Sequence, residues 1–558
     1  MMIKFNLFNL ILLSYTITCM GGKRSAPPNV IVFMTDDMGW ADVGYHSDHV
    51  LTPNIDTLAA DGIILNQYYT QPLCSPSRGA LLTGVHPIHT GLQNCVILDT
   101  QPIGLPLHFK LWPQYLKQYD YATHIVGKWH LGHMQREHTP TYRGFDSHVG
   151  FWSAYETYFN HTNCDFRNRC GLDFRHNMDL ITNASGVYST HYFTDRCRHV
   201  IDNHNQSKPL FLYMPYQSLH SAALNRTLEA PQEYIDKFGH IESDYRRRLA
   251  AMAYAMDESI GDIVERLNAN NMLENSIIIF ITDNGGDPVH LFGNGGLNWP
   301  LRGSKVHLFE GGVRVPAFIW SPLLNKSGYV SDAMIHVTDL LPTVLDAINS
   351  TGIHDEANIY GVSQWSTLSN QKRPVRWEII HNVDPVWNMS AIRWYDWKLV
   401  QSPIPPYRVD GDSRTHFAYQ GGISIDTQTY WALQMSDRLS CKASKVLSLM
   451  GRRADYNVLQ GSVVECPEPP LPGEVATCDR SLCLFNVRDD PCERRDLLAE
   501  TEPEFVDFLW SKLVEFNRTA VPPLSLVPLD PKGDPRLHNN SWINWLDNDV
   551  DMGADGQY

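Results

Sequence analysis

Two segments of the chain share one hydrophobic pattern. Residues 29–35 and 276–282 are short, almost continuous apolar runs that are rich in Val and Ile. Runs of this kind are typical of strands that helices cover on both faces, as in a layered α/β sheet. Each run is followed at once by two polar residues, Asp36 and Asp37 after the first and Asp283 and Asn284 after the second. The pattern therefore predicts two buried strands that end in side chains bearing oxygen atoms.

Between these two runs the apolar spacing changes to that of a helix. Within residues 245–270, apolar side chains recur every three or four positions, at Leu249, Met252, Met256, Ile260, Ile263 and Leu267. This spacing predicts an amphipathic helix that packs on the sheet, and it needs no functional explanation. Towards the C-terminus we expect a short antiparallel sheet and a helix near Glu504 to Phe516. The Pro-rich stretches at 403–406, 467–472 and 521–531 are predicted to be ordered loops of that part.

The polar residues after the two strands form a candidate metal site. In open α/β sheets the ligand binds at the carboxyl ends of the strands. Three carboxylates and one amide at this edge are hard oxygen donors, which suit Ca²⁺ or Mg²⁺ and, without His or Cys, suit zinc poorly. Either pair alone would be explained by a turn or a helix cap. Their occurrence after two matching strands favours the metal.

The composition limits the partners of such a site. The chain of 558 residues is 43% hydrophobic and 19% charged, as expected for a folded soluble protein with one large and one smaller domain. Its formal net charge of −16 argues against general affinity for nucleic acid or for an anionic membrane. An anionic substrate would therefore need a local cluster of basic residues.

The first 21 residues are typical of a cleaved signal peptide. Lys4 precedes a short apolar run at residues 10–13, and this run is too short to span a bilayer. A buried N-terminal helix is the alternative. No other stretch has the length of a membrane helix, so we expect no membrane anchor. Nine Asn-x-Ser/Thr sequons also favour the secretory pathway, at Asn160, Asn183, Asn205, Asn225, Asn325, Asn349, Asn388, Asn517 and Asn539.

The cysteine content fits the same pathway. Eleven cysteines are present, and nine remain when Cys19 in the leader and Cys74 are set aside. Nine cysteines allow four disulfides and one free thiol in an oxidising compartment. Two pairs are close enough in sequence to be local disulfides, Cys164 with Cys170 and Cys483 with Cys492. The remaining connections stay open.

One segment carries a specific motif. Residues 74–84, Cys-Ser-Pro-Ser-Arg-Gly-Ala-Leu-Leu-Thr-Gly, resemble the signature of the sulfatase family. In that family the Cys of Cys-x-Pro-x-Arg is oxidised to formylglycine in the endoplasmic reticulum. The five-residue core alone is weak evidence, but Leu-Leu-Thr-Gly follows it here and a run ending in Asp-Asp precedes it. The alternative is a Pro-initiated helix with a half-buried thiol.

Three further blocks resemble the same family in the expected order. They are residues 127–132 (Gly-Lys-Trp-His-Leu-Gly), 217–220 (Gln-Ser-Leu-His), and 301–305 followed by 310–316. The resemblance covers residues 27–350 well and is closest to the arylsulfatase B-like, or N-acetylgalactosamine-4-sulfatase, group. The chain departs from the usual pattern at Val85, His86, Ser221 and the single Cys95. These departures concern substrate detail more than the chemistry.

The resemblance implies an architecture and cofactors. It implies an α/β fold, with an alkaline phosphatase-like mixed sheet sandwiched by helices over residues 27–375 and a smaller α+β C-terminal subdomain over 376–558. It also implies a Ca²⁺ ion held by Asp36, Asp37, Cys74, Asp283 and Asn284. The formylglycine-generating enzyme would be the partner that converts Cys74. The protein would then be lysosomal or secreted.

The resemblance also implies roles for individual residues. A formylglycine hydrate has two hydroxyls, of which one attacks sulfur and the other later expels sulfate. Arg78 would steady the hydrate, while Lys128 and Lys305 would neutralise the sulfate oxygens. His220 would contact the substrate and protonate the leaving alcohol, and His130 would take the proton from the second hydroxyl.

The expected substrates are aryl sulfates and sulfated carbohydrates of the glycosaminoglycan type. The specific expectation is the 4-sulfate of N-acetylgalactosamine. Two rival functions are a phosphodiesterase or phosphonate hydrolase of the same superfamily, and a secreted binding protein without activity. The intact Cys-x-Pro-x-Arg motif argues against the first rival, because those hydrolases usually use Thr or Ser. The retained Lys and His residues argue against the second.

Overall fold

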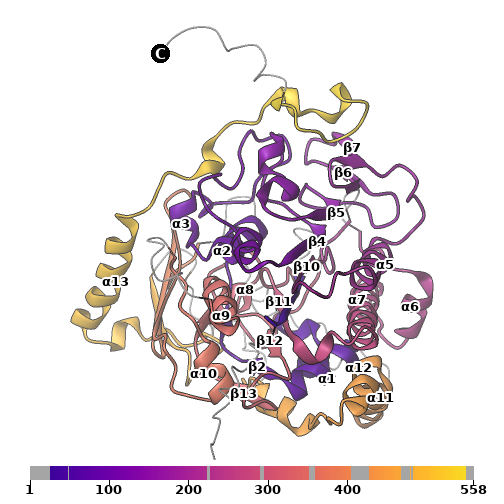
Figure 1. Ribbon diagram of the computed structural model, residues 1–558. Helices are drawn as coiled ribbons and strands as arrows, with labels where there is room; N and C mark the ends of the chain where they lie inside the picture. The colour runs from indigo at the N-terminus through magenta and orange to yellow at the C-terminus, as the bar shows by residue number, and fades with distance from the viewer. Residues whose placement is uncertain are drawn as a thin grey trace, which may run out of the picture.

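The computed structural model contains a central sheet of ten strands between two layers of helices (Figure 1). It describes residues 26–47, 49–222, 227–288, 294–350, 359–403, 427–466, 478 and 482–547. In spatial order the strands are β13 (Tyr329–Ser331), β2 (Ile63–Leu65), β12 (Phe318–Trp320), β11 (Ser276–Thr282), β1 (Asn29–Thr35), β10 (Leu210–Pro215), β4 (Ala122–Lys128), β5 (Ser147–Phe151), β8 (Arg175–His176) and β9 (Asp179–Leu180). The central strands β11, β1, β10, β4 and β5 are parallel, while β12 and β8 run antiparallel to their neighbours. The sheet is therefore mixed, as the sequence predicts.

The two predicted strands are β1 and β11, and they lie side by side at the centre of the sheet. Every residue of both strands is buried. In β1, Ile31 and Phe33 belong to one hydrophobic core, whereas Val30 and Val32 belong to the core on the other side. Alternate side chains thus fill separate cores on opposite faces. This arrangement explains why the runs are apolar throughout rather than alternating.

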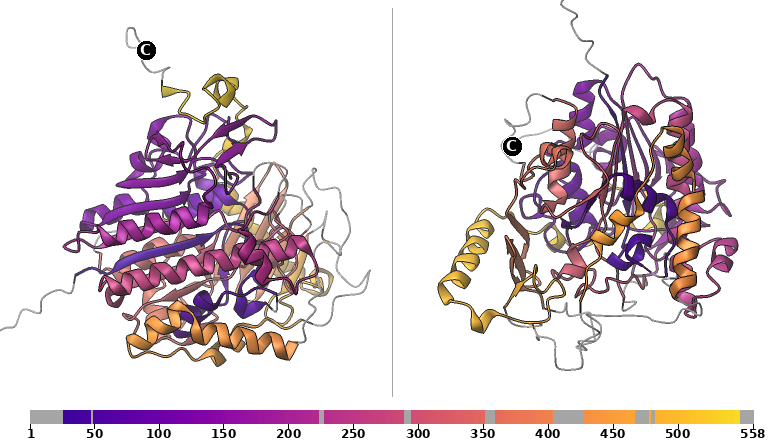
Figure 2. Two further views of the ribbon diagram at one scale, coloured as in Figure 1. Left: turned by 90° about the vertical axis from the view of Figure 1, so that its right-hand side faces the viewer. Right: turned by 90° about the horizontal axis from the view of Figure 1, so that it is seen from below.

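Helices form a layer on each face of the sheet, which Figure 2 shows from two further directions. One layer contains α1 (Pro53–Asp61), α5 (Ser189–Asp202), α6 (Gln232–Lys237), α7 (Asp244–Ala269), α11 (Thr427–Ser440) and α12 (Lys442–Leu449). The other contains α2 (Cys74–Thr83), α4 (Trp112–Leu116), α9 (Leu340–Ala347) and α10 (Trp365–Asn370). The short helices α3 (Pro87–Thr90) and α8 (Glu310–Val313) share hydrophobic cores with the C-terminal sheet instead. Helix α7 matches the helix expected over 245–270, and its apolar stripe is buried. That prediction is confirmed.

A second, antiparallel sheet forms the C-terminal part of the fold. Its strands are β15 (Glu378–Asp384), β16 (Met389–Trp394), β17 (Trp397–Gln401) and β18 (Cys483–Asn486). Helix α13 (Pro503–Asn517) packs on it, at the outer left of Figure 1, and Leu509 and Leu513 share its core. The predicted small sheet and the helix near Glu504 to Phe516 are confirmed. Two-stranded sheets are formed by β3 (Tyr68–Tyr69) with β14 (Ile335–His336) and by β6 (Thr162–Cys164) with β7 (Cys170–Leu172).

Not all of the C-terminal sequence belongs to this small sheet. Helix α12 lies against α1 and α7, where Ala443 N donates a hydrogen bond to the side chain of Asn54. Farther along, Trp542 Nε1 donates to the carbonyl of Asn163. The domain boundary near residue 375 stays a prediction. The expected leader, most of the Pro-rich stretch at 403–406 and all of 467–472 lie outside the described residues, whereas 521–531 is ordered and includes a short 3₁₀ turn at Leu524–Leu526.

The disulfide expectations are only partly right. Cys164 and Cys170 form the expected bond. The expected pair of Cys483 with Cys492 is wrong, because Cys483 bonds to Cys478 and Cys492 bonds to Cys466. The extended strand β18 starts at Cys483 and carries the chain away from it, so the cysteine that precedes the strand is the nearer partner. Among the nine cysteines considered there are three disulfides rather than four, and Cys95, Cys197 and Cys441 are free thiols.

Two further sequence features can be located on the fold. The asparagines of the eight sequons within the described residues are all exposed, and Asn225 lies outside those residues. Across the described part of the chain, no helix combines the length and the apolar character needed to cross a bilayer.

Candidate active site

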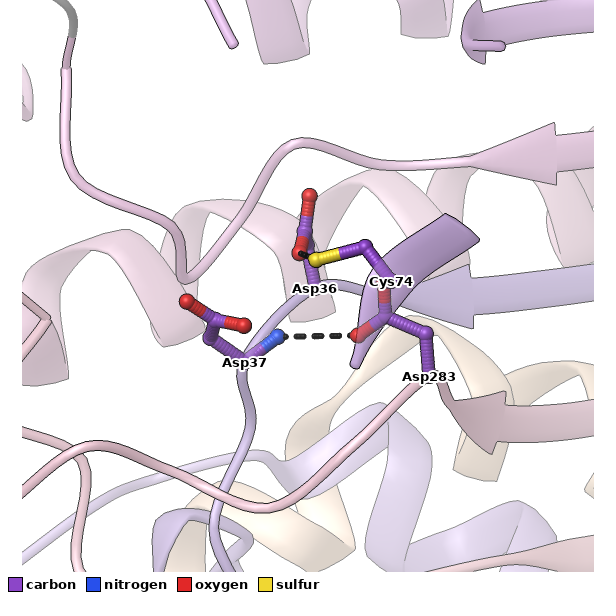
Figure 3. Close-up of side chains that lie close together, drawn as sticks. All are labelled: Asp36, Asp37, Cys74 and Asp283. Carbon is purple, nitrogen blue, oxygen red and sulfur yellow. Dashed lines mark hydrogen bonds between the residues drawn. The ribbon is translucent and has the colours of Figure 1, made fainter. Parts of the chain in front are cut away.

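The carboxylates predicted to lie together do so at the carboxyl ends of β1 and β11. The parallel register pairs Thr35 with Thr282, so the residues that follow each strand are level with each other. Figure 3 shows the side chains of Asp36, Asp37 and Asp283 converging, with Asp37 N donating to Asp283 Oδ1 at 3.2 Å. One ligand atom from each of these residues and from Cys74 lies within 4.8 Å of the others. All four side chains are buried.

Cys74 is the first residue of helix α2, and it faces this acidic cluster. Its Sγ lies 3.6 Å from Asp36 Oδ1 (Figure 3). The first turn of the helix is fixed to the end of β11, since Thr70 Oγ1 and Ser77 Oγ both donate to the carbonyl of Asp283. Unpaired backbone N–H groups at a helix N-terminus favour an anion. Burial raises the pKa of the Cys74 thiol well above its usual range, more than Lys128 and Lys305 lower it, so an unmodified Cys74 stays a neutral thiol.

Three buried cations face the three carboxylates. Arg78 Nη2 lies 2.8 Å from Asp283 Oδ2. Lys128 Nζ lies 2.5 Å from Asp36 Oδ2, and Lys305 Nζ lies 2.6 Å from Asp37 Oδ1. The motif, the end of β4 and the loop before α8 therefore each contribute one cation. Together these residues form the local basic cluster that an anionic substrate would need in a protein of net charge −16.

The carboxylates differ in their electrostatic balance. Burial, followed by repulsion from Asp283, raises the pKa of Asp36 to about 7, although Lys128 and Arg78 lower it. Burial acts in the same direction on Asp37, but Lys305 and His220 outweigh it and lower the pKa of Asp37 to about 2. The two cations beside Asp36 therefore do not offset burial and the charge of Asp283. That is the condition under which a bound divalent cation stabilises a carboxylate cluster.

The amide of Asn284 tests whether these residues fit a metal. Asn284 Nδ2 donates to Asp37 Oδ1 at 2.7 Å, whereas Oδ1 is buried and has no hydrogen-bond partner among the described residues. A buried, unpaired amide oxygen is costly unless something else binds it. Together with three carboxylates it completes a donor set of hard oxygen atoms that suits Ca²⁺ or Mg²⁺. The residues therefore fit a metal of this class.

His130 follows β4 and is held by a main-chain carbonyl. Its Nε2 lies 3.0 Å from Ile97 O, and because a carbonyl can only accept, Nε2 carries the proton. Its Nδ1 is buried with no hydrogen-bond partner among the described residues. Burial, with Lys128 and Arg78 nearby, lowers the pKa of His130 well below its usual range. The ring thus presents an unprotonated nitrogen, as a base requires.

His220 is anchored through the other ring nitrogen, Nδ1. Its Nδ1 lies 2.9 Å from the carbonyl of Ser221, while Nε2 lies 3.7 Å from Asp37 Oδ2. Burial lowers the pKa of His220 to about 3, and the nearby lysines add to this effect against the charge of Asp37. Nε2 is therefore unprotonated here, and an additional anion beside the ring would favour a proton on it. A sulfate ester is such an anion.

The structure brings all ten candidate site residues into one cluster. The members are Asp36, Asp37, Cys74, Arg78, Lys128, His130, His220, Asp283, Asn284 and Lys305. His86, one of the departures from the usual pattern, does not join it. Its Nε2 lies 3.0 Å from the carbonyl of Ile380 in β15, so this residue ties the chain after α2 to the small sheet.

Two sets of contacts near the site were not foreseen. The first links it to the small sheet, because Lys398 of β17 lies 2.9 Å from Glu310, five residues after Lys305. The second is the ring of Tyr155, which stacks on the ring of His220. Neither residue stands in a motif. Lys398 also lies beyond residues 27–350, the part of the chain that the resemblance to the family covers well.

Comparison with known proteins identifies the family. The Sulfatase family model matches residues 28–350, which is more than half of the chain. The chain belongs to the sulfatase family. The sulfatase is 35% identical to arylsulfatase J of Mus musculus over 552 residues, which cover 94% of this chain and 81% of that protein. It is 30% identical to N-acetylgalactosamine-6-sulfatase of Homo sapiens over 366 residues, covering 61% of this chain and 66% of that protein.

A solved structure supports the fold. The sulfatase superposes on the crystal structure of Ps i-CgsB in complex with k-i-k-neocarrahexaose with a TM-score of 0.68 and 23% identity, covering 92% of this chain and 98% of that one. The alkaline phosphatase-like α/β architecture expected from the sequence is therefore confirmed. The family also confirms the predicted class of reaction, the hydrolysis of sulfate esters. The N-acetylgalactosamine-4-sulfatase group stays a prediction.

Proposed function

We propose that this sulfatase hydrolyses sulfate monoesters of carbohydrates, with formylglycine derived from Cys74 as the nucleophile and with bound Ca²⁺. The observation that carries the proposal is the position of Cys74. It lies at a helix N-terminus, in contact with an acidic cluster and with its thiol held neutral. A neutral thiol is a poor nucleophile, and sulfur is a poor ligand for a hard cation. Conversion to an oxygen-bearing residue removes both defects.

Formylglycine and Ca²⁺ would supply an oxygen nucleophile and additional positive charge, which the side chains alone do not provide. Formylglycine, as its hydrate, supplies one hydroxyl for attack on sulfur and a second one for the release of sulfate. Asp36, Asp37, Asp283 and Asn284 would hold a Ca²⁺ ion, which would supply positive charge to lower the pKa of a hydroxyl and to polarise a sulfate oxygen. We propose Ca²⁺ rather than Mg²⁺ because carboxylate and amide oxygens from two strand ends form a geometrically tolerant set.

The cationic side chains bind and orient the anion. Arg78 is fixed by two hydrogen bonds to Asp283, at 3.1 and 2.8 Å, so it can steady residue 74 without moving. Lys128 contacts Asp36 through Nζ, which leaves further N–H groups for a sulfate oxygen, and Lys305 places a second positive charge beside Asp37. Because these charges are buried and pre-positioned, they stabilise charge that builds up in the transition state.

The two histidines move protons in opposite directions. His220 donates from Nε2 to the leaving alcohol, since its Nδ1 is already committed to the carbonyl of Ser221. His130 accepts at Nδ1 the proton of the second hydroxyl as sulfate leaves, since its Nε2 is committed to Ile97. Each main-chain contact thus selects which nitrogen reacts.

The similarity to an N-acetylgalactosamine-6-sulfatase supports a sulfated carbohydrate as the substrate. Within that class, we propose the 4-sulfate of N-acetylgalactosamine from the resemblance of the sequence. Maturation by the formylglycine-generating enzyme implies passage through the endoplasmic reticulum, followed by delivery to lysosomes or by secretion. The exposure of all eight described sequon asparagines is compatible with that route.

The decisive assay is sulfate release by protein co-expressed with the formylglycine-generating enzyme in a secretory host. N-acetylgalactosamine 4-sulfate, its 6-sulfate and a glucosamine 6-sulfate are compared from acidic to neutral pH. Preference for the 4-sulfate would support the specific proposal. Preference for either 6-sulfate would overturn it and leave the sulfatase chemistry intact, while phosphodiester or phosphonate cleavage without sulfate release would overturn the chemistry itself.

A further inference from the structure

We propose that Tyr155 is a positioning residue that holds the imidazole of His220 in its reactive orientation, and that residues 155–158 form a clamp on the Gln217–His220 segment. This inference rests on the proposed role of His220 as the proton donor. Tyr155 lies in none of the sequence motifs, and it acts through His220 rather than on the reacting atoms.

The first contact is between two rings. The centroids of the Tyr155 and His220 rings lie 5.2 Å apart, and the ring planes differ by 16°. This is an offset stack, a favourable arrangement of aromatic rings. The stack covers one face of the imidazole and opposes rotation of the ring about its bond to Cβ. Rotation would break the contact of Nδ1 with Ser221 and turn Nε2 away from the leaving group.

Hydrogen bonds between side chains and the main chain also join residues 155–158 to the Gln217–His220 segment. Gln217 Oε1 accepts from Glu156 N at 2.9 Å, and Gln217 Nε2 donates to Glu156 O at 2.7 Å. Tyr158 Oη donates to the carbonyl of His220 at 2.8 Å. Gln217 and Tyr158 are almost completely buried. The clamp therefore fixes the backbone of His220 as well as its ring.

The clamp is supported by segments far away in the sequence. Tyr155 Oη donates to the carbonyl of Cys164, which is joined to Cys170 by a disulfide. The β6–β7 hairpin closed by this disulfide is held in turn by Trp542, whose Nε1 donates to Asn163 and whose N donates to Leu172. A support path thus runs from the C-terminal segment through the hairpin to Tyr155.

The role of Tyr155 is tested by measuring kcat on sulfate esters with different leaving groups. In Tyr155→Leu, kcat for alkyl and sugar sulfates should fall about ten times more than kcat for aryl sulfates with acidic phenols, because only poor leaving groups need a donor in place. Tyr155→Phe keeps the ring and should restore most of the loss. Tyr395→Leu, which removes an exposed tyrosine of the small sheet, is the matched control and should match wild type on both substrate types.

Three results would overturn the inference. The first is an equal loss of kcat on all leaving groups, which would indicate general damage to the fold. The second is a higher KM for sugar sulfates with kcat unchanged, which would make Tyr155 a sugar-binding residue. The third is a loss in Tyr155→Phe as large as in Tyr155→Leu.

A crystal structure of Tyr155→Leu decides the inference without turnover. The ring of His220 should then adopt more than one orientation and lose its single contact with Ser221. One unchanged orientation would overturn the clamp. If the wild-type protein with converted Cys74 released no sulfate, the proposed function would fail, and this structure would still show whether Tyr155 holds the ring.

Discussion

The carboxylates of the site and its two histidines are held by different kinds of contact. Asp36, Asp37 and Asp283 each lie between 2.5 and 2.8 Å from a buried cationic nitrogen. By contrast, His130 and His220 are each anchored through one ring nitrogen by a main-chain carbonyl. The acidic half is a network of three carboxylates and three cations, in which burial still raises the pKa of Asp36. The histidine half is built so that one nitrogen of each ring can exchange a proton.

This difference assigns a separate task to each half. A buried carboxylate whose paired cations outweigh burial, as at Asp37, keeps its charge and binds other charges. Neutral rings with one uncommitted nitrogen change their protonation when the substrate arrives or leaves. Damage to the acidic half should therefore affect every substrate and the bound metal. Damage to the histidine half should affect single proton transfers and leave the metal in place.

The largest effect is expected from Asp283→Ala. Asp283 anchors Arg78 and would contribute an oxygen to the proposed metal site, so the variant should lose Ca²⁺ and activity together. We expect a fall in kcat/KM of roughly 10³-fold or more, since several kcal/mol of charge stabilisation are lost. Elemental analysis of the purified protein measures the metal, and Asp195→Ala, an exposed aspartate of α5, is the matched control. Stoichiometric Zn²⁺ in the native site would contradict the all-oxygen donor set.

His130→Ala should have the next largest effect. Without a base at Nδ1, release of sulfate should become limiting, and the enzyme should accumulate with sulfate bound covalently at residue 74. A loss in kcat of about 10²–10⁴-fold is expected on aryl and sugar sulfates alike. Intact-protein mass spectrometry during turnover detects the added sulfate. His199→Ala removes an exposed histidine as the control, and a variant that turns over slowly without a sulfated intermediate would refute the assignment.

His220→Ala should have the smallest effect on activated substrates. Its rate should fall about 10²–10⁴-fold on sugar sulfates and much less on aryl sulfates whose phenols leave without a proton. Calcium content should match wild type, unlike in Asp283→Ala. The measurement is kcat across a series of leaving groups of rising pKa. Equal losses across that series would remove His220 from the role of general acid.

Sequence reasoning located the acidic half well for a physical reason. Parallel strands place their carboxyl ends at one edge, so two matching apolar runs ending in Asp-Asp and Asp-Asn predict a meeting point without any contact information. This conclusion does not require the order of the other strands in the sheet. Motifs added Lys128, His130, His220 and Lys305, because each stands in a recognisable block. The structure brings these residues to the same edge.

The tertiary contacts that hold the site residues in place could not be predicted in the same way. Tyr155 meets His220 across 65 positions, and Trp542 meets Asn163 across 379, with no periodic pattern to relate them. The pairing of Cys483 with Cys478 depends on where β18 begins, which propensity locates poorly. Contacts of this kind are set by tertiary packing, so they emerge only with the fold.

The most direct test of the whole account is the chemical state of residue 74 in active protein. Protein from a secretory host, assayed for sulfate release, is digested, and the peptide containing residues 74–78 is analysed by mass spectrometry. Formylglycine is expected in a fraction that rises with specific activity, and Cys74→Ala is expected to fold with the wild-type melting temperature but to release no sulfate. Fully active protein that carries only unmodified Cys74 would contradict it.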